Sequence, residues 1–250
     1  MMNTPVLEAS AVDKQFPNGV TALQGIYLTV ARGETMVLIG ESGSGKTTLL
    51  RLFNRLDDPT AGDIWIHGRS AREEDPILLR RRIGYVQQDG GLLPHWTVGR
   101  NVGLVPTLLG WPADQTQHRV ETLLELVNLD PHHYWDRYPS QLSGGERQRV
   151  AFARALAADP EVVLLDEPFG ALDAITRDDL QKQFLQLKGK LHKTMVLVTH
   201  DLNEAFRLGD RVAVLRQGRV LQTGTPDQLL EHPAEGYVRS LLDHRAGFKT

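Results

Sequence analysis

The most informative stretch of the sequence is residues 36–56, which read MVLIGESGSGKTTLLRLFNRL. Met36–Ile39 is a continuous apolar run, as expected of a strand buried on both faces of a parallel sheet. A glycine-rich loop follows, and from Lys46 to about Leu56 the pattern is that of a helix. Strand, loop and helix in this order predict a phosphate-binding loop at residues 40–47, which match G-x-x-x-x-G-K-T.

The chemistry of this phosphate loop (residues 40–47) follows from its residue types. Glycines let the backbone turn tightly and aim N–H groups at a phosphate, and the following helix contributes its positive end. Lys46 supplies a positive charge for the β- and γ-phosphates, and the Thr47 hydroxyl is a ligand for Mg²⁺. Glu41 looks unfavourable here but matters little if its side chain points outward. The predicted nucleotide-binding residues are Gly40, Glu41, Ser42, Gly43, Ser44, Gly45, Lys46, Thr47 and Thr48. The loop alone does not distinguish kinases, GTPases and ATPases.

Two carboxylates follow another buried strand. Val162–Leu165 is apolar throughout, and Asp166 and Glu167 come directly after it. The carboxyl ends of parallel strands are where ligands of α/β proteins bind. There Asp166 can hold Mg²⁺ through its waters, and Glu167 can polarise an attacking water. Taken alone, the pair could equally be two solvated carboxylates.

A third motif, residues 142–149, reads LSGGERQR. Ser143 and Glu146 have the spacing of a capping box, which predicts the start of a helix. Gly144 and Gly145 leave that helix start bare, so that hydroxyl, N–H groups and helix dipole form a second anion site. An ordinary capped helix accounts for Ser143 and Glu146 but not for the paired glycines. Two phosphate sites in one chain favour a sandwich, in which the second site faces a partner's nucleotide.

Composition excludes several classes. The chain has 250 residues with 41% hydrophobic and 24% charged, which are globular values. The formal net charge is −3, so nucleic-acid binding is not indicated. Because cysteine is absent, disulfide scaffolds and thiolate chemistry are excluded. No apolar run approaches the ~20 residues that span a bilayer, and the N-terminus lacks the basic and apolar regions of a signal peptide.

The order of patterns along the chain predicts an α/β protein with a helical insertion. Val6–Phe16 and Leu23–Val30 resemble strands, whereas helical spacing dominates from about residue 90 to 160. Strands return at Val162–Leu165 and Met195–Val198, with the helical stretch Ala174–Leu191 between them. We divide the chain into a first part of the nucleotide-binding core (1–89), a helical subdomain (90–160), a second part of the core (161–225) and C-terminal helices (226–250).

With these motifs in this order, the chain resembles the ATP-binding cassette (ABC) ATPases from about residue 5 to 245. The resemblance implies an α/β fold, a P-loop NTPase (RecA-like) core with an antiparallel β-subdomain and an inserted α-helical subdomain. It implies ATP and Mg²⁺ as cofactors. Catalytic roles fall on Glu167, His200, Lys46 and Gln88, and Mg²⁺ ligation falls on Thr47, Gln88 and Asp166.

The same resemblance assigns the remaining residues. Phe16 matches an aromatic that stacks on adenine, where many members have Tyr. Gln88 matches the γ-phosphate-sensing glutamine, because counting back from Leu93-Pro94-His95 favours it over the adjacent Gln87. His200 matches a histidine that contacts the γ-phosphate, and Ala171-Leu172-Asp173 matches a loop that crosses a dimer interface. The predicted nucleotide contacts outside the phosphate loop are thus Phe16, Gln88, Ser143, Gly144, Gly145, Glu146 and Asp173.

Partners are implied as well. Two copies would pair head to tail, each ATP lying between the phosphate loop of one copy and the 142–149 segment of the other. Integral-membrane permease subunits would bind the cassette, with a solute-binding protein as an indirect partner and no nucleic acid. His95 and Trp96 lie where family members approach the permease, although packing explains Trp96 equally well. The expected location is cytoplasmic, peripheral on the inner face of the cell membrane.

Three further stretches narrow the family. Residues 102–111 (VGLVPTLLGW), 128–131 (NLDP) and 205–211 (AFRLGDR) are similar to the ATPases of importers for quaternary-ammonium osmoprotectants such as glycine betaine, choline or carnitine. The alternatives are importers of amino acids, methionine or polyamines. A soluble ABC ATPase acting on nucleic acid or ribosomes is opposed by the net charge. A non-hydrolysing regulatory cassette is opposed by the presence of Glu167 and His200.

Overall fold

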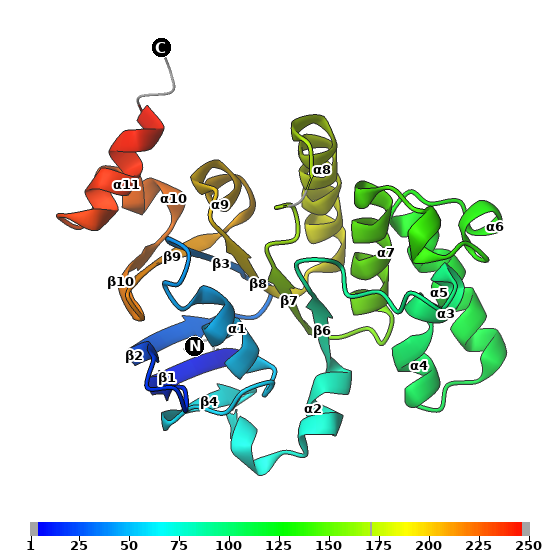
Figure 1. The fold of residues 1–250 in the computed structure, drawn as a ribbon, viewed down its shortest axis with the longest axis horizontal. Helices are drawn as coiled ribbons and strands as arrows, with labels where there is room; N and C mark the ends of the chain where they lie inside the picture. The colour runs from blue at the N-terminus through cyan, green and yellow to red at the C-terminus, as the bar shows by residue number, and fades with distance from the viewer. Residues whose placement is uncertain (1–4, 171, 247–250) are drawn as a thin grey trace. The chain divides into compact units, whose positions relative to one another are not determined.

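A computed structural model of the protein describes residues 5–170 and 172–246. The chain forms two compact units, shown in sequence colours in Figure 1. Unit 1 comprises the segments up to Leu79 and from Thr194 onward, and unit 2 comprises Arg80–Lys193.

Unit 1 contains an antiparallel sheet with the strand order β2-β1-β4-β5. Leu7, near the start of β1, lies opposite Val30 of β2 and Ile66 of β4, and all three side chains are buried. Alternation along β1 thus places one face of the sheet in the core, as the sequence pattern predicts. The strands are β1 (Leu7–Gln15), β2 (Thr21–Val30), β4 (Ala61–Ile66) and β5 (Arg69–Ser70).

The second group of strands in unit 1 is arranged around β3 (Thr35–Ile39), which pairs in parallel with β8 (Thr194–Thr199) and β9 (Arg211–Arg216). β9 in turn pairs antiparallel with β10 (Arg219–Gly224). Every residue of β3 and β8 is buried, which explains the apolar runs Met36–Ile39 and Met195–Val198 within them. Ile39 lies opposite Thr199, so the segments that follow β3 and β8 leave the sheet at the same edge.

Helices cover these strands. α1 packs against β8 and buries Leu49, Leu50, Leu52 and Phe53. α9 packs against β3 and β8, and α11 packs against α9. The helices of unit 1 are η1 (Ala71–Glu73), α1 (Lys46–Phe53), α9 (Leu202–Leu208), α10 (Pro226–Glu231) and α11 (Tyr237–Ala246), while α2 (Pro76–Arg82) runs from unit 1 into unit 2. α1 ends three residues before the predicted Leu56, because Arg55 adopts a left-handed conformation with φ 47°.

Unit 2 combines two parallel strands with a helical bundle. β6 (Ile83–Val86) and β7 (Val162–Asp166) pair with Val86 opposite Leu165. α7 contacts α3, α5, α8 and β6 and thus lies at the centre of the unit. The helices are α3 (Val98–Val102), α4 (Leu104–Leu108), α5 (Ala113–Leu126), α6 (Pro131–Tyr134), η2 (Pro139–Gln141), α7 (Gly144–Leu156) and α8 (Ala174–Leu191).

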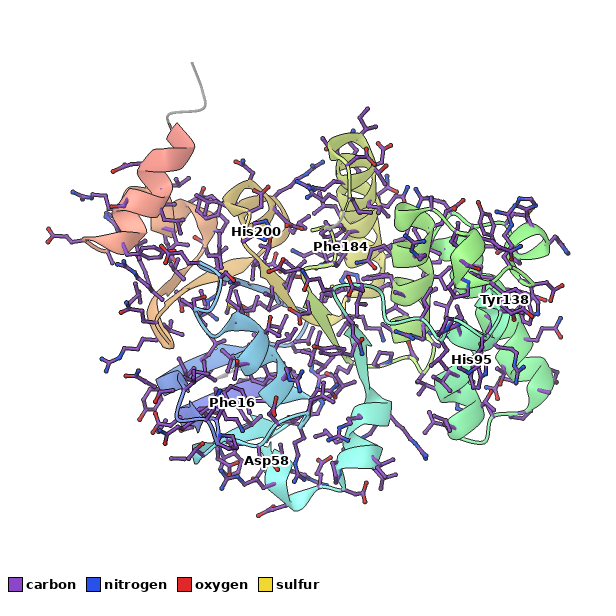
Figure 2. The ribbon with its side chains drawn as sticks, in the orientation of Figure 1. Phe16, Asp58, His95, Tyr138, Phe184 and His200 are labelled. Atoms are coloured by element: carbon purple, nitrogen blue, oxygen red, sulfur yellow. The ribbon has the colours of Figure 1, made fainter. Side chains whose placement is uncertain are left out.

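Aromatic contacts hold α7 and α8 together. The ring of Phe184, labelled on α8 in Figure 2, lies edge-on to Phe152 of α7 at 5.7 Å and to Phe169 at 6.0 Å between ring centroids. Such pairs add stabilisation beyond the area they bury. Because Phe169 follows β7 closely, this cluster also anchors the segment after that strand. Within the described part of the chain, no helix combines the length and hydropathy needed to cross a membrane.

Candidate nucleotide-binding and hydrolysis site

The phosphate loop joins β3 to α1 in unit 1. Gly45, the N-cap of α1, has φ 103° and no side chain caps the helix. A Cβ atom at this position would lie 2.6 Å from the carbonyl oxygen of Ala22, so both conformation and space require glycine. Lys46 is buried, and its ammonium donates hydrogen bonds to the carbonyl oxygens of Gly40 and Glu41, both at 2.8 Å. An uncapped helix start beside a cation is a binding site for an anion.

The loop is also joined to its neighbours by backbone bonds. The N–H of Gly218, in the turn between β9 and β10, donates to the carbonyl of Ser44 at 3.1 Å. The carbonyl of Gly218 in turn accepts from the N–H of Gln24 on β2 at 2.8 Å. A Cβ at Gly218 would lie 2.7 Å from the Ala22 oxygen. The phosphate loop, β2 and the turn between β9 and β10 are therefore tightly packed against one another.

The carboxylate of Glu41 is exposed, as expected for a side chain that points away from the anion site. Burial is the main cause of a raised pKa at Tyr237 of α11, and the charge of Glu41 raises it further. The guanidinium of Arg216 lies 4.4 Å from the centre of the Tyr237 ring. The Glu41 charge is thus directed at the C-terminal helix.

His200 comes directly after β8, as Figure 2 shows. Thr199 and Asp201 fix the backbone on either side of it. The Thr199 hydroxyl accepts a bond from the N–H of Asp201 at 3.0 Å and donates to the buried carboxylate of Glu204. Asp201 caps α9. The parallel pairing of Ile39 with Thr199 places His200 at the same sheet edge as the phosphate loop.

Phe16 follows the end of β1 and is half-buried (Figure 2). Its N–H donates to the carbonyl of Val20 at 2.9 Å, which closes the turn before β2. The ammonium of Lys14 lies 5.1 Å from the ring centre. The aromatic ring of Phe16, which the family resemblance assigns to stacking on adenine, thus lies at a defined turn of unit 1.

In unit 2, the predicted catalytic residues lie at the carboxyl ends of β6 and β7. The hydroxyl of Tyr85 lies 3.5 Å from the buried carboxylate of Asp166. The Gln88 amide nitrogen lies 3.5 Å from a carboxylate oxygen of Glu167. The register that pairs Val86 with Leu165 brings these residues together.

Glu167 has a strained backbone. Its φ is 43°, in the left-handed region that non-glycine residues adopt at a cost. The carbonyl of Glu167 accepts a bond from the N–H of Gly170 at 3.1 Å, which holds the turn. Strain of this kind persists only where the surrounding structure enforces it, and it concentrates at functional sites.

The helix start at Ser143 has the predicted capping box. Ser143 accepts from the N–H of Glu146 at 3.2 Å, and Glu146 accepts from the N–H of Ser143 at 2.7 Å. The second Glu146 oxygen accepts from the hydroxyl of Tyr134 at 2.5 Å. This hydroxyl is the main cause of a lowered pKa at Glu146, and the same bond raises the pKa of Tyr134. Sequence reasoning missed Tyr134, which carries no motif.

The paired glycines also have a packing role. A Cβ at the buried Gly145 would lie 2.7 Å from the methyl group of Thr176 on α8. One at Gly144 would lie 3.3 Å from Leu172. A cavity of about 190 Å³ adjoins this helix start, lined by Gln88, Asp89, Gly144, Arg147, Gln148 and Leu172. The helix start is therefore only partly bare, since Gly145 is covered by α8.

Asp173 is the N-cap of α8 and accepts bonds from the N–H groups of Ile175 at 3.2 Å and Thr176 at 3.1 Å. The bonds with Thr176 are the main cause of a lowered pKa at Asp173. Ala171, the first residue of the predicted 171–173 loop, lies outside the described residues. Unit 1 thus carries the phosphate loop, Phe16 and His200, and unit 2 carries the remaining predicted residues.

Comparison with known proteins decides the family. The family model described as ABC transporter matches residues 23–170. The chain belongs to this family. It is 48% identical over 95% of its length to the glycine betaine/carnitine/choline transport ATP-binding protein OpuCA of Bacillus subtilis, covering 62% of that protein. It is 45% identical over 94% of its length to the sulfate/thiosulfate import ATP-binding protein CysA of Synechococcus elongatus, covering 67% of it.

A solved structure is similar as well. The ATP-binding cassette MJ0796, a dimer in a post-hydrolysis state bound to ADP and Pi, has a TM-score of 0.78 at 34% identity, covering 88% of this chain and 98% of that one. The ABC fold predicted from the sequence is confirmed. The chain spans about three fifths of the length of the osmoprotectant relatives that it matches.

Proposed function

We propose that the chain is the ATP-hydrolysing subunit of an ABC importer. The observation that carries the proposal is Glu167, whose strained backbone holds its carboxylate next to Gln88 at the end of β7. A phosphate loop by itself is compatible with binding alone. A carboxylate positioned by backbone strain beside a polar amide supplies a base for hydrolysis.

Each site residue has a role in this proposal. Lys46 and the start of α1 bind the phosphates, with the Phe16 ring against adenine. Glu167 accepts a proton from the attacking water or orients it, and Gln88 orients Glu167. His200 donates a hydrogen bond to the γ-phosphate. These groups act through positioning and charge rather than covalent chemistry.

The donor set suits Mg²⁺. The exposed Thr47 hydroxyl, the buried Asp166 carboxylate and the Gln88 amide carbonyl all offer oxygen, which this hard cation prefers. When bound, Mg²⁺ neutralises charge on the β- and γ-phosphate oxygens. We propose Thr47, Gln88 and Asp166 as the residues that hold it.

A second copy of the chain would complete the site. The start of α7, with Ser143, Gly144, Gly145 and Glu146, offers an anion site to the nucleotide bound by the other copy, and Asp173 lies on the same side of the interface. The dimeric state of the similar cassette MJ0796 supports this arrangement. Loss of the γ-phosphate would weaken the pairing.

Permease subunits are the proposed membrane partner. Unit 2 has a groove of about 430 Å³ whose lining includes Trp96, Trp111 and Trp135. Aromatic side chains are enriched at protein interfaces. The fully buried Asn101 donates to the carbonyl oxygens of residues 93, 96 and 97 at 3.0–3.1 Å, which fixes the loop that presents Trp96. A rigid loop beside an aromatic groove suits a helix of a permease, which would hold the subunit on the inner face of the membrane.

The solute is the least constrained part of the proposal. Similarity to OpuCA favours a quaternary-ammonium osmoprotectant such as glycine betaine, choline or carnitine, delivered by a solute-binding protein. CysA, named for sulfate and thiosulfate, is 45% identical over a similar span. Cassettes of comparable similarity thus serve different solutes. An importer for amino acids or another small solute is therefore the alternative.

The test starts with phosphate release from Mg·ATP by the purified chain and by Glu167→Gln. Loss of a positioned base predicts a fall of about 10²–10⁴ in kcat, with ATP binding retained. Hydrolysis at the parent rate by Glu167→Gln would refute the base assignment. Tagged Glu167→Gln, recovered with Mg·ATP from gently solubilised membranes of its host, should bring down a multi-spanning permease. Recovery of ribosomes or nucleic acid would refute the importer.

A further inference from the structure

Two side chains of α7 hold the loop that follows Gln88. The guanidinium of Arg154 donates to the carbonyl oxygens of Gly90 at 2.8 Å and Gly91 at 2.7 Å. The amide of Gln148 reaches the carbonyl oxygen of Gln88 at 3.4 Å. The glutamine loop (residues 87–91) is thus attached to α7 at three carbonyl oxygens. The motifs of the sequence give no role to either side chain.

The loop is shaped to receive these bonds. Gly90 and Gly91 have φ 75° and 60°, and a Cβ at Gly91 would lie 2.6 Å from the side-chain oxygen of Gln87. Glycine adopts this conformation without strain, and it turns both carbonyl oxygens toward Arg154. The positions of these two carbonyl oxygens therefore match the reach of the Arg154 side chain.

Burying the charged guanidinium of Arg154 costs free energy, because the group loses its hydration. Burial lowers its pKa, and within the described residues 5–170 and 172–246 it forms no ion pair. A desolvated guanidinium usually has a carboxylate partner. Here the guanidinium of Arg154 donates to two backbone carbonyl oxygens instead, and these bonds fix the position of the backbone.

Gln148 extends the connection to the carboxylate strand. The same amide nitrogen donates to the carbonyl oxygen of Pro168 at 2.6 Å. Pro168 is buried and directly follows the strained Glu167. α7 begins at Ser143, so one helix carries the capped anion site, the glutamine loop and the support behind Glu167.

From these contacts we propose that Gln148 and Arg154 are positioning residues that make α7, the glutamine loop and the Glu167–Pro168 turn move as one piece. This inference rests on the proposed hydrolysis. A displacement of the glutamine loop is then felt at once at Glu167 and at the start of α7. Each residue acts through the backbone that it holds.

The test compares Arg154→Met and Gln148→Met with a matched control, Arg119→Met. Arg119 of α5 donates to the carbonyl oxygens of Leu156 at 2.9 Å and Ala157 at 3.2 Å, at the far end of the same helix. Both arginine variants lose bonds to two carbonyl oxygens. Arg119→Met also loses an ion pair with the exposed Asp159, but exposed pairs contribute little, so both variants should lower Tm similarly. Displacement of the base by the loop variants should reduce kcat by about 10–10²-fold with KM unchanged, whereas Arg119→Met should retain kcat.

Conservative variants sharpen the test. Arg154→Lys keeps a donor and should recover part of kcat, although it lacks the planar fork. Gln148→Glu keeps the size but cannot donate to the Pro168 carbonyl, so its kcat should be no higher than that of Gln148→Met. Equal kcat in all variants, or an equal loss in Arg119→Met, would overturn the proposal and leave only a structural role.

Hydrogen exchange provides a readout independent of hydrolysis. Arg154→Met and Gln148→Met should accelerate amide exchange in peptides covering residues 87–91, and Gln148→Met also in residues 168–170, while Arg119→Met leaves both unchanged. Unchanged exchange in the loop variants would overturn the link. If the parent chain fails to hydrolyse Mg·ATP, the proposed function fails, and the exchange data still decide whether the link exists.

Discussion

Replacing Glu167 with glycine should stabilise the fold while removing activity. The left-handed φ of 43° costs a residue with a Cβ about 1–2 kcal/mol. Glycine releases that strain but loses about 0.5–1 kcal/mol more backbone entropy on folding. The Gln88 contact at 3.5 Å is at the limit of a hydrogen bond and adds little. The expected net gain is about 0.5–1 kcal/mol, or roughly 1–4 °C in Tm for a chain of this size.

Urea unfolding and calorimetry of Glu167→Gly, Glu167→Gln and the parent provide the assay. Glu167→Gln keeps the Cβ and the strain, so it should be less stable than Glu167→Gly. Ala11→Gly is the matched control, because Ala11 is exposed, has φ 50° and changes by one methyl group. A Glu167→Gly variant no more stable than Glu167→Gln, beside a stabilised Ala11→Gly, would show that the site enforces no strain.

Three other perturbations have definite outcomes. The hydroxyl of Tyr134 lowers the pKa of Glu146, so this pair stabilises the fold above the unfolded pKa of Glu146 and loses that contribution as pH falls through the folded pKa. Tyr134→Phe should therefore reduce the loss of unfolding free energy at acid pH. An unchanged acid dependence of the unfolding free energy would contradict the assignment. Gly145→Val should destabilise by about 1–3 kcal/mol through overlap with Thr176, measured by urea unfolding against Gly145→Ala, which should lose less. Lys46→Met should lose affinity for a fluorescent ATP analogue while keeping a folded circular dichroism spectrum, and parental affinity would remove Lys46 from the phosphate site.

Local patterns in the sequence predict much of this fold. The helix Ala174–Leu191 has the predicted bounds. The capping box predicted at Ser143 is confirmed, because a cap depends on residues three positions apart.

Contacts between distant segments are what the sequence could not provide. Tyr134 and Arg154 carry no motif, and their partners are brought near only by the packing of α6 and α7. The strain at Glu167 is equally invisible in the sequence, since left-handed backbone at a glutamate has no local signal. The glycine pair at residues 144–145 signalled an anion site, yet the packing of Gly145 on Thr176 explains part of the same pattern. The roles of the site residues stay predictions.

The turn between β9 and β10 deserves care in any engineering of this chain. Surface hairpins are the usual places for inserted tags, fluorescent labels or split-protein breakpoints. Here the N–H of Gly218 donates to Ser44 of the phosphate loop, and its carbonyl oxygen accepts from Gln24 of β2. A reporter inserted into this turn would displace the phosphate loop, which we expect to bind the nucleotide. A probe that must leave ATP affinity untouched therefore belongs at another turn.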